Sequence, residues 1–457
     1  MFDQQPLFAR EQIGNPMAVG MKPLSFYRNV ISAAIGGDED DGKLPEDAKR
    51  RVREIRDQFP LGAYTDSVGS PYVRQMVADF LEKRDGANTS PDDIMMSNGA
   101  SEAANLLMNT IIREGDEIMI PIPQYPLYSA TITLVGATRK NYFLNEDDNW
   151  SFDIEGCEPT ERTRVFVAIN PGNPTGSCLP ESSILEILRK IERDAPNCIV
   201  VADEVYQDNI WNESRPFVSF RKVATEHDLN VPIVTLHSTS KGLIGECGMR
   251  GGFAHFHNID EETIKLVTKL RSISLCPNTV GQMMMGLLVT PPSPEDESYV
   301  VCSMFERAPF HAPITTISLP NRYEQFQEEQ GQVKRSMKRK AIKTQSFLNS
   351  LDGVSCTDID GAMYAFPKLE LPKWFEELAS ERGVQPDFLY CQELLDRTGI
   401  VTVPGSGFGQ CEGTSHLRTT ILPEESEMDL FYPTWEEFHR NLYLSSGADF
   451  IVGSSNI

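Results

Sequence analysis

One stretch of the chain brings a lysine, two serines and an arginine close together among glycines. It runs from His237 to Gly252 (HSTSKGLIGECGMRGG), with Ser238 and Ser240 before Lys241 and with Arg250 nine positions after that lysine. A lysine amine forms Schiff bases with aldehydes, and hydroxyl groups together with a guanidinium bind phosphate. The stretch therefore suits pyridoxal phosphate, a phosphorylated aromatic aldehyde. A glycine-rich surface loop with a solvated lysine and arginine would contain the same residues, because short motifs often occur by chance.

A second polar segment, NPGNPTG at residues 170–176, directly follows the apolar run RVFVAI at residues 164–169. Its prolines and glycines restrict the backbone, so Asn173 can present its amide in a fixed direction. An ordinary turn that uses asparagine for its turn propensity is the alternative interpretation.

A third polar segment, ADEVYQDN at residues 202–209, follows another apolar run. Here Asp203 could keep a pyridine nitrogen protonated by pairing with its charge, and Tyr206 could donate to the phenolic oxygen of the same ring. The structural alternatives are a helix N-cap for Asp203 and core packing for Tyr206. A metal site made of Asp203, Glu204 and Asp208 is a further alternative, which we discount because no histidine stands at ligand spacing.

The elements that would hold these segments alternate between strands and helices. Short apolar strands that alternate with helices of ten or more residues indicate an α/β fold with a mostly parallel, covered sheet. Ligands bind at the carboxyl ends of the strands in such sheets, and all three polar segments follow predicted strands. The sequence predicts a sheet of seven strands, at residues 94–97, 117–120, 138–143, 164–169, 198–202, 233–237 and 252–257.

The chain of 457 residues is too long for one compact core, and we expect two or three domains. An N-terminal segment at residues 1–44 precedes a large cofactor-binding domain at residues 45–322 and a smaller α+β domain at residues 323–457. Residues 300–321 contain three prolines and no helical or strand period, and they form an atypical insertion in the large domain. We interpret this insertion as a translated intron or a similar gene-model error. If it is real, we expect an exposed loop remote from the cofactor.

The composition excludes several classes of partner. The 42 basic and 66 acidic residues give a formal net charge of −24, which repels nucleic acids and anionic membrane surfaces. No apolar stretch reaches membrane-spanning length. The nine cysteines form no C-x-x-C pair, which indicates reduced intracellular thiols and no metal site. The first residues lack the pattern of a signal peptide, so we expect a cytoplasmic protein.

Taken together, the polar segments resemble those of a known family. NPGNPTG, ADEVYQDN and HSTSKG followed by GMRGG resemble the class I aminotransferases of the fold-type I pyridoxal-phosphate group. PIPQYPLYSA, LRSISLCP, GAMYAFP and VPGSGFGQ with HLRTTILP resemble one branch, the alanine aminotransferases and their plant glutamate–glyoxylate relatives. The resemblance extends from Ile13 to about Phe438, apart from residues 300–321.

The resemblance implies a role for each polar side chain around the cofactor ring. Lys241 would form the Schiff base with pyridoxal phosphate and move a proton between substrate and cofactor. Asp203 would pair with the pyridine nitrogen, and Tyr125 would stack on the ring. Asn173 and Tyr206 would contact the phenolate oxygen. The expected catalytic residues are Lys241, Asp203 and Tyr206.

A second set of residues would bind the phosphate and the substrate. Tyr64 of the partner subunit would reach the phosphate, so the resemblance implies a homodimer with shared active sites. Arg418, with Asn173, would bind the substrate α-carboxylate by a two-point salt bridge, and Gly14 would let the backbone approach that carboxylate. The expected phosphate-binding residues of the same subunit are Ala100, Ser101, Ser238, Ser240 and Arg250.

The implied reaction is a ping-pong transfer of an amino group from L-alanine to 2-oxoglutarate, which gives pyruvate and L-glutamate. Glutamate–glyoxylate aminotransferase, aromatic aminotransferase and pyridoxal-phosphate lyase activities are alternatives that share these motifs. The family usually has a longer N-terminal arm, whereas 12 residues precede Ile13 here. A missing start would leave room for a mitochondrial or peroxisomal targeting segment, and those compartments are the alternatives to the cytoplasm.

Overall fold

The computed structural model describes residues 14–36, 44–59, 61–293, 296 and 322–445. Residues 300–321, interpreted above as an insertion, lie outside the described part of the chain. The interpretation of this insertion therefore stays a prediction. The predicted domain boundaries also stay predictions.

The chain divides into two compact units, and each unit is assembled from separate stretches of sequence. The first unit takes residues 1–21, 111–233 and 336–457, and the second takes residues 22–110 and 234–335. Asn173, Asp203 and Arg418 therefore belong to the first unit. Lys241 and Arg250 belong to the second.

The predicted α/β class is confirmed, and every predicted strand is present. The prediction of seven strands is one short, because the sheet has an eighth strand, β4 (Ser151–Phe152), which pairs antiparallel with β3. A strand of two residues is too short to show an alternating pattern in the sequence. The strand order is β1-β8-β7-β6-β5-β2-β3-β4. The remaining strands are β1 (Ile94–Ser97), β2 (Glu117–Ile122), β3 (Thr138–Asn145), β5 (Thr163–Ile169), β6 (Ile199–Asp203), β7 (Ile233–Ser238) and β8 (Gly252–His257).

Parallel pairing in the first unit brings two of the polar segments to the same edge of the sheet. Strand β5 pairs in parallel with β6, and Ile169 lies opposite Asp203 in that register. The backbone N–H of Asn170 donates to the carbonyl oxygen of Asp203 at 3.0 Å. The segments that follow these two strands therefore start side by side.

Helix α6 (Glu181–Asp194) illustrates why the elements of the first unit form where they do. Its apolar residues Ile184, Ile187, Leu188 and Ile191 recur at helical spacing, and all four are at most 1% exposed. They pack in one hydrophobic core with residues of β5 and β6. A helix with one apolar stripe is stabilised mainly by this burial. The neighbouring helices of this part are α5 (Pro126–Val135) and α7 (Phe220–Glu226).

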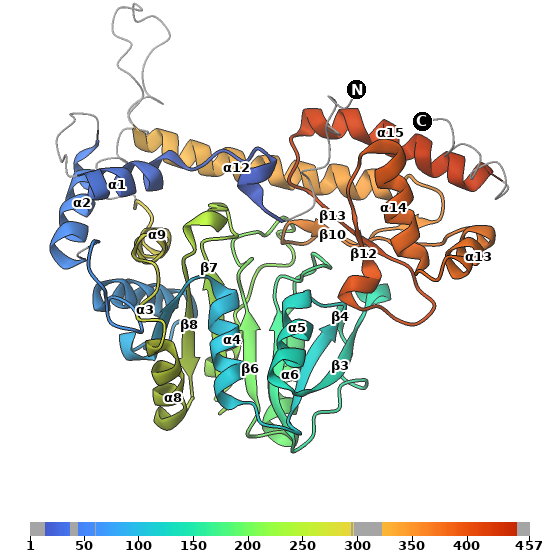
Figure 1. Ribbon diagram of the computed structural model, residues 1–457. Helices are drawn as coiled ribbons and strands as arrows, with labels where there is room; N and C mark the ends of the chain where they lie inside the picture. The colour runs from blue at the N-terminus through green and yellow to red at the C-terminus, as the bar shows by residue number, and fades with distance from the viewer. Residues whose placement is uncertain (1–13, 37–43, 60, 294–295, 297–321, 446–457) are drawn as a thin grey trace, which may run out of the picture. The chain divides into compact units, whose positions relative to one another are not determined.

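The C-terminal part of the first unit is built around a small antiparallel sheet in the order β10-β13-β12. This sheet places Arg418 on β13, opposite Val403 of β12, and Tyr364 on β10, opposite Thr420. Helices α13, α14 and α15 lie beside these strands (Figure 1). The elements are β9 (Val354–Ser355), β10 (Tyr364–Ala365), β11 (Lys368–Leu369), α13 (Lys373–Glu381), α14 (Pro386–Thr398), β12 (Val403–Pro404), β13 (Leu417–Thr420) and α15 (Glu425–Leu444).

Most helices of the second unit pack in one hydrophobic core with residues of the antiparallel pair β1 and β8. In the pair, Ser97 at the end of β1 lies opposite Gly252 at the start of β8. This register brings the start of α4 close to the segment that precedes β8. The helices are α1 (Ser25–Gly36), α2 (Glu46–Gln58), α3 (Pro71–Asp85), α4 (Ala100–Ile111), α8 (Glu261–Ser272) and α9 (Thr279–Val289), with α12 (Arg322–Leu348) beginning in this unit.

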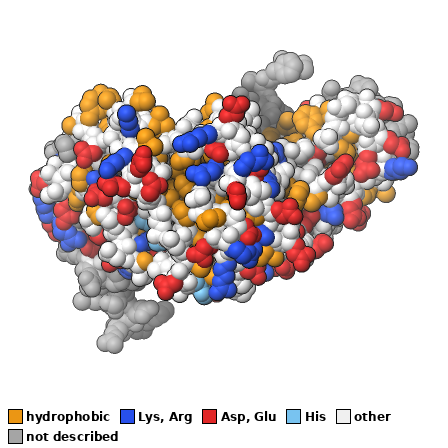
Figure 2. Space-filling view, turned by 90° about the horizontal axis from the view of Figure 1, so that it is seen from below, with side chains coloured by type: hydrophobic (Ala, Val, Ile, Leu, Met, Phe, Trp, Pro, Cys, Tyr) orange, Lys and Arg blue, Asp and Glu red, His pale blue; other side chains and the backbone are white. Residues whose placement is uncertain are grey.

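Acidic and basic side chains are interspersed on the face of the molecule drawn in Figure 2. The excess of negative charge is therefore not gathered in one patch on that face. Among the described residues, no helix combines the length and apolarity that crossing a membrane requires. The same part of the chain holds no group of three His, Cys, Asp or Glu residues placed to bind a metal ion.

The buried carboxylate of Glu117 at the start of β2 makes the stability of the first unit dependent on pH. Burial raises the pKa of Glu117, but hydrogen bonds from Thr160 and Thr163 and the charges of Lys140 and Arg162 outweigh it, so the pKa lies below its ordinary value of 4.5. A lowered pKa stabilises the fold above the unfolded value, and this contribution is lost as the pH falls through the folded value.

We predict that Glu117→Gln lowers the thermal unfolding midpoint at pH 7, because about 1–3 kcal/mol of charged hydrogen bonding is lost. The difference from the wild-type chain should shrink as the pH falls below 4.5 and the wild-type carboxylate is protonated. Thermal unfolding followed by circular dichroism at a series of pH values measures the difference in midpoint and its dependence on pH. A destabilisation that stays the same over that range would contradict the assigned role of the charge.

Candidate active site

The first unit joins three of the predicted site residues through direct polar contacts. The Nη1 of Arg418 donates to Oδ1 of Asn173 at 3.1 Å, and Nδ2 of Asn173 donates to the hydroxyl of Tyr206 at 3.4 Å. Arg418 is 8% exposed, and Asn173 and Tyr206 are also buried. The amide of Asn173 thus connects Arg418, which is predicted to bind a carboxylate, with Tyr206, which is predicted to contact a phenolate oxygen.

Two aromatic rings cover the guanidinium of Arg418. Its central carbon lies 4.4 Å from the ring centroid of Tyr364 and 4.7 Å from that of Phe408. Cation–π contacts of this kind are favourable when the cation is desolvated. They also hold the plane of the guanidinium, so its donors point in fixed directions.

The carboxylate of Asp203 receives a hydrogen bond from a residue that the sequence did not single out. The hydroxyl of Tyr128, on α5, donates to Oδ2 of Asp203 at 2.7 Å. Burial, followed by the charge of Asp203, raises the pKa of Tyr128 well above its usual value, so this phenol remains a donor. Such a bond favours the charged form of Asp203, which pairing with a protonated ring nitrogen requires.

Burial and the neighbouring hydroxyl of Tyr364 likewise raise the pKa of Tyr206 well above the usual range. Tyr206 is therefore a neutral phenol, and its hydroxyl donates to that of Tyr364 at 3.2 Å. A neutral phenol can donate to a negatively charged oxygen, which is the role predicted for Tyr206.

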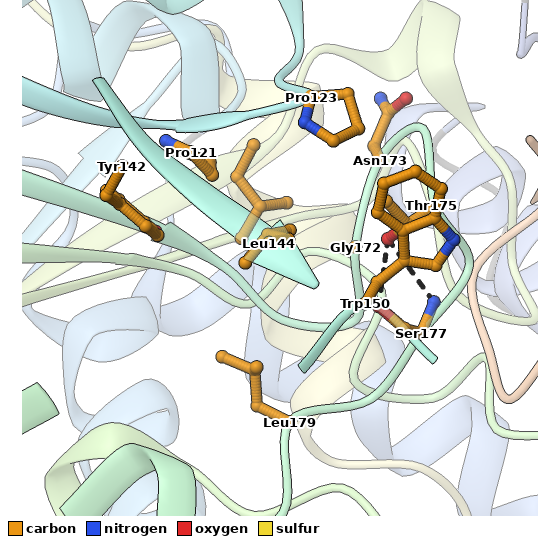
Figure 3. A pocket seen from close by; sticks show the side chains of 11 residues that line it. Pro121, Pro123, Tyr142, Leu144, Trp150, Gly172, Asn173, Thr175, Ser177 and Leu179 are labelled. Atoms are coloured by element: carbon orange, nitrogen blue, oxygen red, sulfur yellow. Dashed lines mark hydrogen bonds between the residues drawn. The ribbon is translucent and has the colours of Figure 1, made fainter. Parts of the chain in front are cut away.

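A small cavity of about 20 Å³ lies behind the NPGNPTG segment (Figure 3). Asn173 and Thr175 line it, and the hydroxyls of Thr175 and Ser177 lie 2.9 Å apart in its wall. This volume holds about one water molecule and is far too small for a cofactor. The segment is therefore packed tightly on this side.

The second unit gathers the predicted phosphate-binding residues around Arg250. Its Nη2 donates to the carbonyl of Asn98, and its Nη1 lies 3.5 Å from the hydroxyl of Ser240. The backbone N–H of Ser240 donates to the hydroxyl of Ser238 at 2.9 Å. Because Asn98 directly precedes the turn into α4, Ala100 and Ser101 at the N-terminus of that helix belong to the same region.

In the second unit, glycines allow the guanidinium of Arg250 to lie close to the start of α4. A Cβ on Gly99 would lie 2.6 Å from Nη2 of Arg250, and a Cβ on Gly252 would lie 2.7 Å from the Cα of Gly99. Gly99 also has a φ of +91°, which side chains rarely adopt. The glycines on both sides of Arg250 therefore leave its guanidinium next to a helix N-terminus, which favours anions.

Three further predicted residues have different surroundings. Tyr64 is 77% exposed in the second unit, and Tyr125 is 38% exposed at the N-cap of α5 in the first unit. Gly14 has a φ of +41°, and a Cβ there would lie 2.0 Å from the hydroxyl oxygen of Tyr364. Gly14 thus has a packing requirement in addition to the carboxylate-binding role predicted for it.

Residues 34–431 match the family described as aminotransferase class I and II. The chain belongs to this family. It is therefore an enzyme that transfers amino groups, as the motifs predicted. The match contains Asn173, Asp203, Lys241, Arg250 and Arg418.

Relatives of this aminotransferase carry two different names. The chain is 40% identical to glutamate–glyoxylate aminotransferase 2 of Arabidopsis thaliana, over 96% of this chain and 89% of that protein. It is 38% identical to a probable mitochondrial alanine aminotransferase of Dictyostelium discoideum, over 94% of this chain and 79% of that protein. It is 37% identical to alanine aminotransferase 1 of Mus musculus, over 94% and 86%.

Solved structures confirm the fold of the whole chain. An alanine aminotransferase of Pyrococcus furiosus superposes with a TM-score of 0.74 at 23% identity, over 94% of this chain and 91% of that one. A tyrosine aminotransferase of Leishmania infantum superposes with a TM-score of 0.72 at 18% identity, over 95% and 91%. At these identities the likeness establishes the fold only.

Tyr128, Tyr364 and Phe408 had no predicted role, although each lies within a motif that carried the resemblance. For Tyr128 a signal existed, since it stands three residues, about one helical turn, after Tyr125. For the other two, no spacing in the sequence points to Arg418.

We predict that Gly252→Ala lowers aminotransferase activity at least about tenfold, because its Cβ would push β8 away from the Gly99 backbone and displace Arg250. Gly248→Ala is the matched control: it lies in the same segment and its Cβ would meet no atom within 4 Å. Steady-state activity and soluble yield of both variants measure the effect. Equal losses of activity in the two variants would show that the packing of Gly252 against Gly99 does not cause the loss.

Proposed function

We propose that this aminotransferase moves the amino group of L-alanine to 2-oxoglutarate with pyridoxal phosphate as its cofactor. The observation that carries the proposal is the buried Arg418 bound to Asn173 at 3.1 Å, a cation suited to an α-carboxylate beside an amide suited to the cofactor. Relatives named alanine aminotransferase match 94% of the chain, which supports L-alanine as the amino donor.

The chemistry of both groups of residues fits pyridoxal phosphate. The second unit offers a primary amine at Lys241, and next to it hydroxyls and the Arg250 guanidinium at the N-terminus of α4. The first unit offers a carboxylate that is held charged by Tyr128 and a neutral phenol at Tyr206. Aldehyde, phosphate, ring nitrogen and ring oxygen each find a partner of the right chemistry in these sets.

Lys241, Asp203 and Tyr206 each have one task in this proposal. When bound, pyridoxal phosphate supplies an aldehyde carbon conjugated with a ring that accepts electrons. The amine of Lys241 would hold the cofactor aldehyde and would accept the proton taken from the substrate Cα. Asp203 keeps its negative charge and favours a proton on the ring nitrogen, and Tyr206 donates to the ring oxygen.

Binding and orientation fall to the remaining residues. Arg418 binds the α-carboxylate with donors that its aromatic neighbours hold in one plane, which fixes the Cα–H bond relative to the ring. Tyr125 covers the ring. Ser238, Ser240 and Arg250, with the start of α4, bind the phosphate.

We also propose that the enzyme acts as a homodimer in which Tyr64 of the partner subunit reaches the phosphate. An exposure of 77% in the single chain suits a tyrosine that becomes covered on association. The cytoplasm is the compartment that we propose, since the cysteines of the described residues are free thiols and most are buried.

Glyoxylate is the second candidate for the amino acceptor. The match at 40% identity to a glutamate–glyoxylate aminotransferase favours it. Steady-state kinetics with L-glutamate as donor and either pyruvate or glyoxylate as acceptor separate the two reactions. A kcat/KM for glyoxylate well above that for pyruvate would favour the second candidate.

Absorption spectroscopy tests the central proposal. We predict that the purified chain with added pyridoxal phosphate shows a Schiff-base band, that L-alanine converts this band to that of the amine form, and that 2-oxoglutarate restores it. Lys241→Ala should lack the Schiff-base band and turnover. A wild-type band that ignores L-alanine, or a band unchanged in Lys241→Ala, would refute the proposal.

We predict that Asp203→Asn lowers kcat/KM at least about a hundredfold, because an uncharged amide leaves a buried charge without its partner at a cost of about 3 kcal/mol. Tyr128→Phe removes one hydrogen bond to the carboxylate and should lower kcat/KM about tenfold. Tyr142→Phe is the control, since the buried hydroxyl of Tyr142 donates to the carbonyl of Val167 and not to Asp203. A loss in Tyr142→Phe as large as that in Tyr128→Phe would contradict the role of Tyr128.

A further inference from the structure

Four buried side chains of the first unit close a ring of contacts, and three of them already have proposed roles. Arg418 contacts Asn173, Asn173 contacts Tyr206, and Tyr206 contacts Tyr364 through the hydroxyls. The ring of Tyr364 then lies over Arg418 at 4.4 Å. Tyr364 is the member without a role, although it touches both the residue for substrate and a residue for cofactor.

The hydroxyl of Tyr364 bears on how well Tyr206 can donate. A phenol has one proton, so Tyr206 cannot give it to Tyr364 and to a ring oxygen at once. In their 3.2 Å contact the hydroxyl of Tyr206 donates and that of Tyr364 accepts. The hydroxyl of Tyr364 therefore competes with a ring oxygen for the single proton of Tyr206.

The ring of Tyr364 bears on the orientation of Arg418. Tyr364 and Phe408 cover the guanidinium at 4.4 and 4.7 Å, which leaves its edge for polar partners. One edge donor, Nη1, is directed to Asn173. A guanidinium held in its binding orientation loses less conformational freedom when a carboxylate arrives.

Gly14 provides independent evidence that the position of this hydroxyl matters. Its missing side chain leaves room for the hydroxyl of Tyr364, which a Cβ would approach to 2.0 Å. The backbone here accommodates the oxygen atom, at a φ of +41°.

We propose that Tyr364 is a positioning residue with two separable actions: its ring orients Arg418 for the substrate carboxylate, and its hydroxyl accepts the Tyr206 proton and so weakens the hydrogen bond from Tyr206 to the cofactor oxygen. The proposal rests on the proposed function, since it assumes a carboxylate substrate and a bound pyridoxal phosphate. It adds a residue that neither the motifs nor the family assignment required.

Two substitutions separate the two actions. Tyr364→Phe keeps the ring and removes the hydroxyl, whereas Tyr364→Leu removes both. Tyr432→Phe is the control for loss of a buried hydroxyl in the same unit, since Tyr432 contacts Thr344 outside the site. Thermal unfolding of all three variants identifies general losses of structure.

The first measurement is kinetic. We predict that Tyr364→Leu raises KM for both the amino acid and the 2-oxo acid at least about tenfold with a smaller change in kcat, as expected for a lost binding orientation. Tyr364→Phe should keep both KM values within about twofold. A Tyr364→Leu enzyme with unchanged KM values overturns the action of the ring. If Tyr364→Leu does not fold, Phe408→Leu removes the other aromatic cover and takes its place.

The second measurement needs no turnover. The pH midpoint of the Schiff-base absorption band reports hydrogen bonding to the ring oxygen, because a less stabilised phenolate favours the protonated imine. Tyr364→Phe should move this midpoint to lower pH, because Tyr206 then donates to the ring oxygen alone, and Tyr432→Phe should not move it. A midpoint in Tyr364→Phe equal to that of the wild type overturns the action of the hydroxyl.

Failure of the proposed function would look different. A wild-type chain that ignored L-alanine but accepted another amino acid would change the substrate assignment, and the variants would be compared with that amino acid instead. The absorption midpoint is measured without substrate, so it tests the hydroxyl in either case.

Discussion

Burial of charge is the constraint on which the candidate site depends. Arg418 lies on the buried strand β13 with only 8% of its surface exposed, and a buried guanidinium is costly unless its donors and faces are occupied. Asn173 takes one donor, and Tyr364 and Phe408 take the two faces. The same contacts fix the direction of the guanidinium donors, which suits the proposed binding of a carboxylate.

The backbone around these side chains is held by a second buried charge. Asp360 accepts hydrogen bonds from Asn149 and Asn212, and its backbone carbonyl accepts from Trp211. Burial raises the pKa of Asp360, which shows that these bonds only partly offset its desolvation. Because Asp360 stands four residues before Tyr364, it ties the strand carrying that tyrosine to the loop that follows Asp203.

The arginine of the second unit, Arg250, is exposed and is held by a different means. Arg250 itself has a left-handed backbone, with a φ of +53°, and glycines on both sides let its guanidinium approach the start of α4. Here the charge is held by backbone carbonyls and hydroxyls instead of aromatic rings. Such a set leaves the arginine suited to a phosphate, whereas the aromatic cover in the first unit suits a planar carboxylate.

The sequence by itself determined the features of this protein that depend on residues close to one another in the chain. Each polar segment follows a strand whose apolar pattern is continuous, so the α/β class, the seven longer strands and the family could be predicted from residue types and order. Lys241, Asp203 and Asn173 were proposed as site residues in the same way. Only the tertiary structure decided which side chains surround them, since Tyr128 and Asp203 are 75 residues apart and Asn173 and Arg418 are 245 apart. No period or motif encodes which tyrosine donates to a carboxylate or which ring covers a guanidinium; those contacts arise from how separate stretches of chain pack.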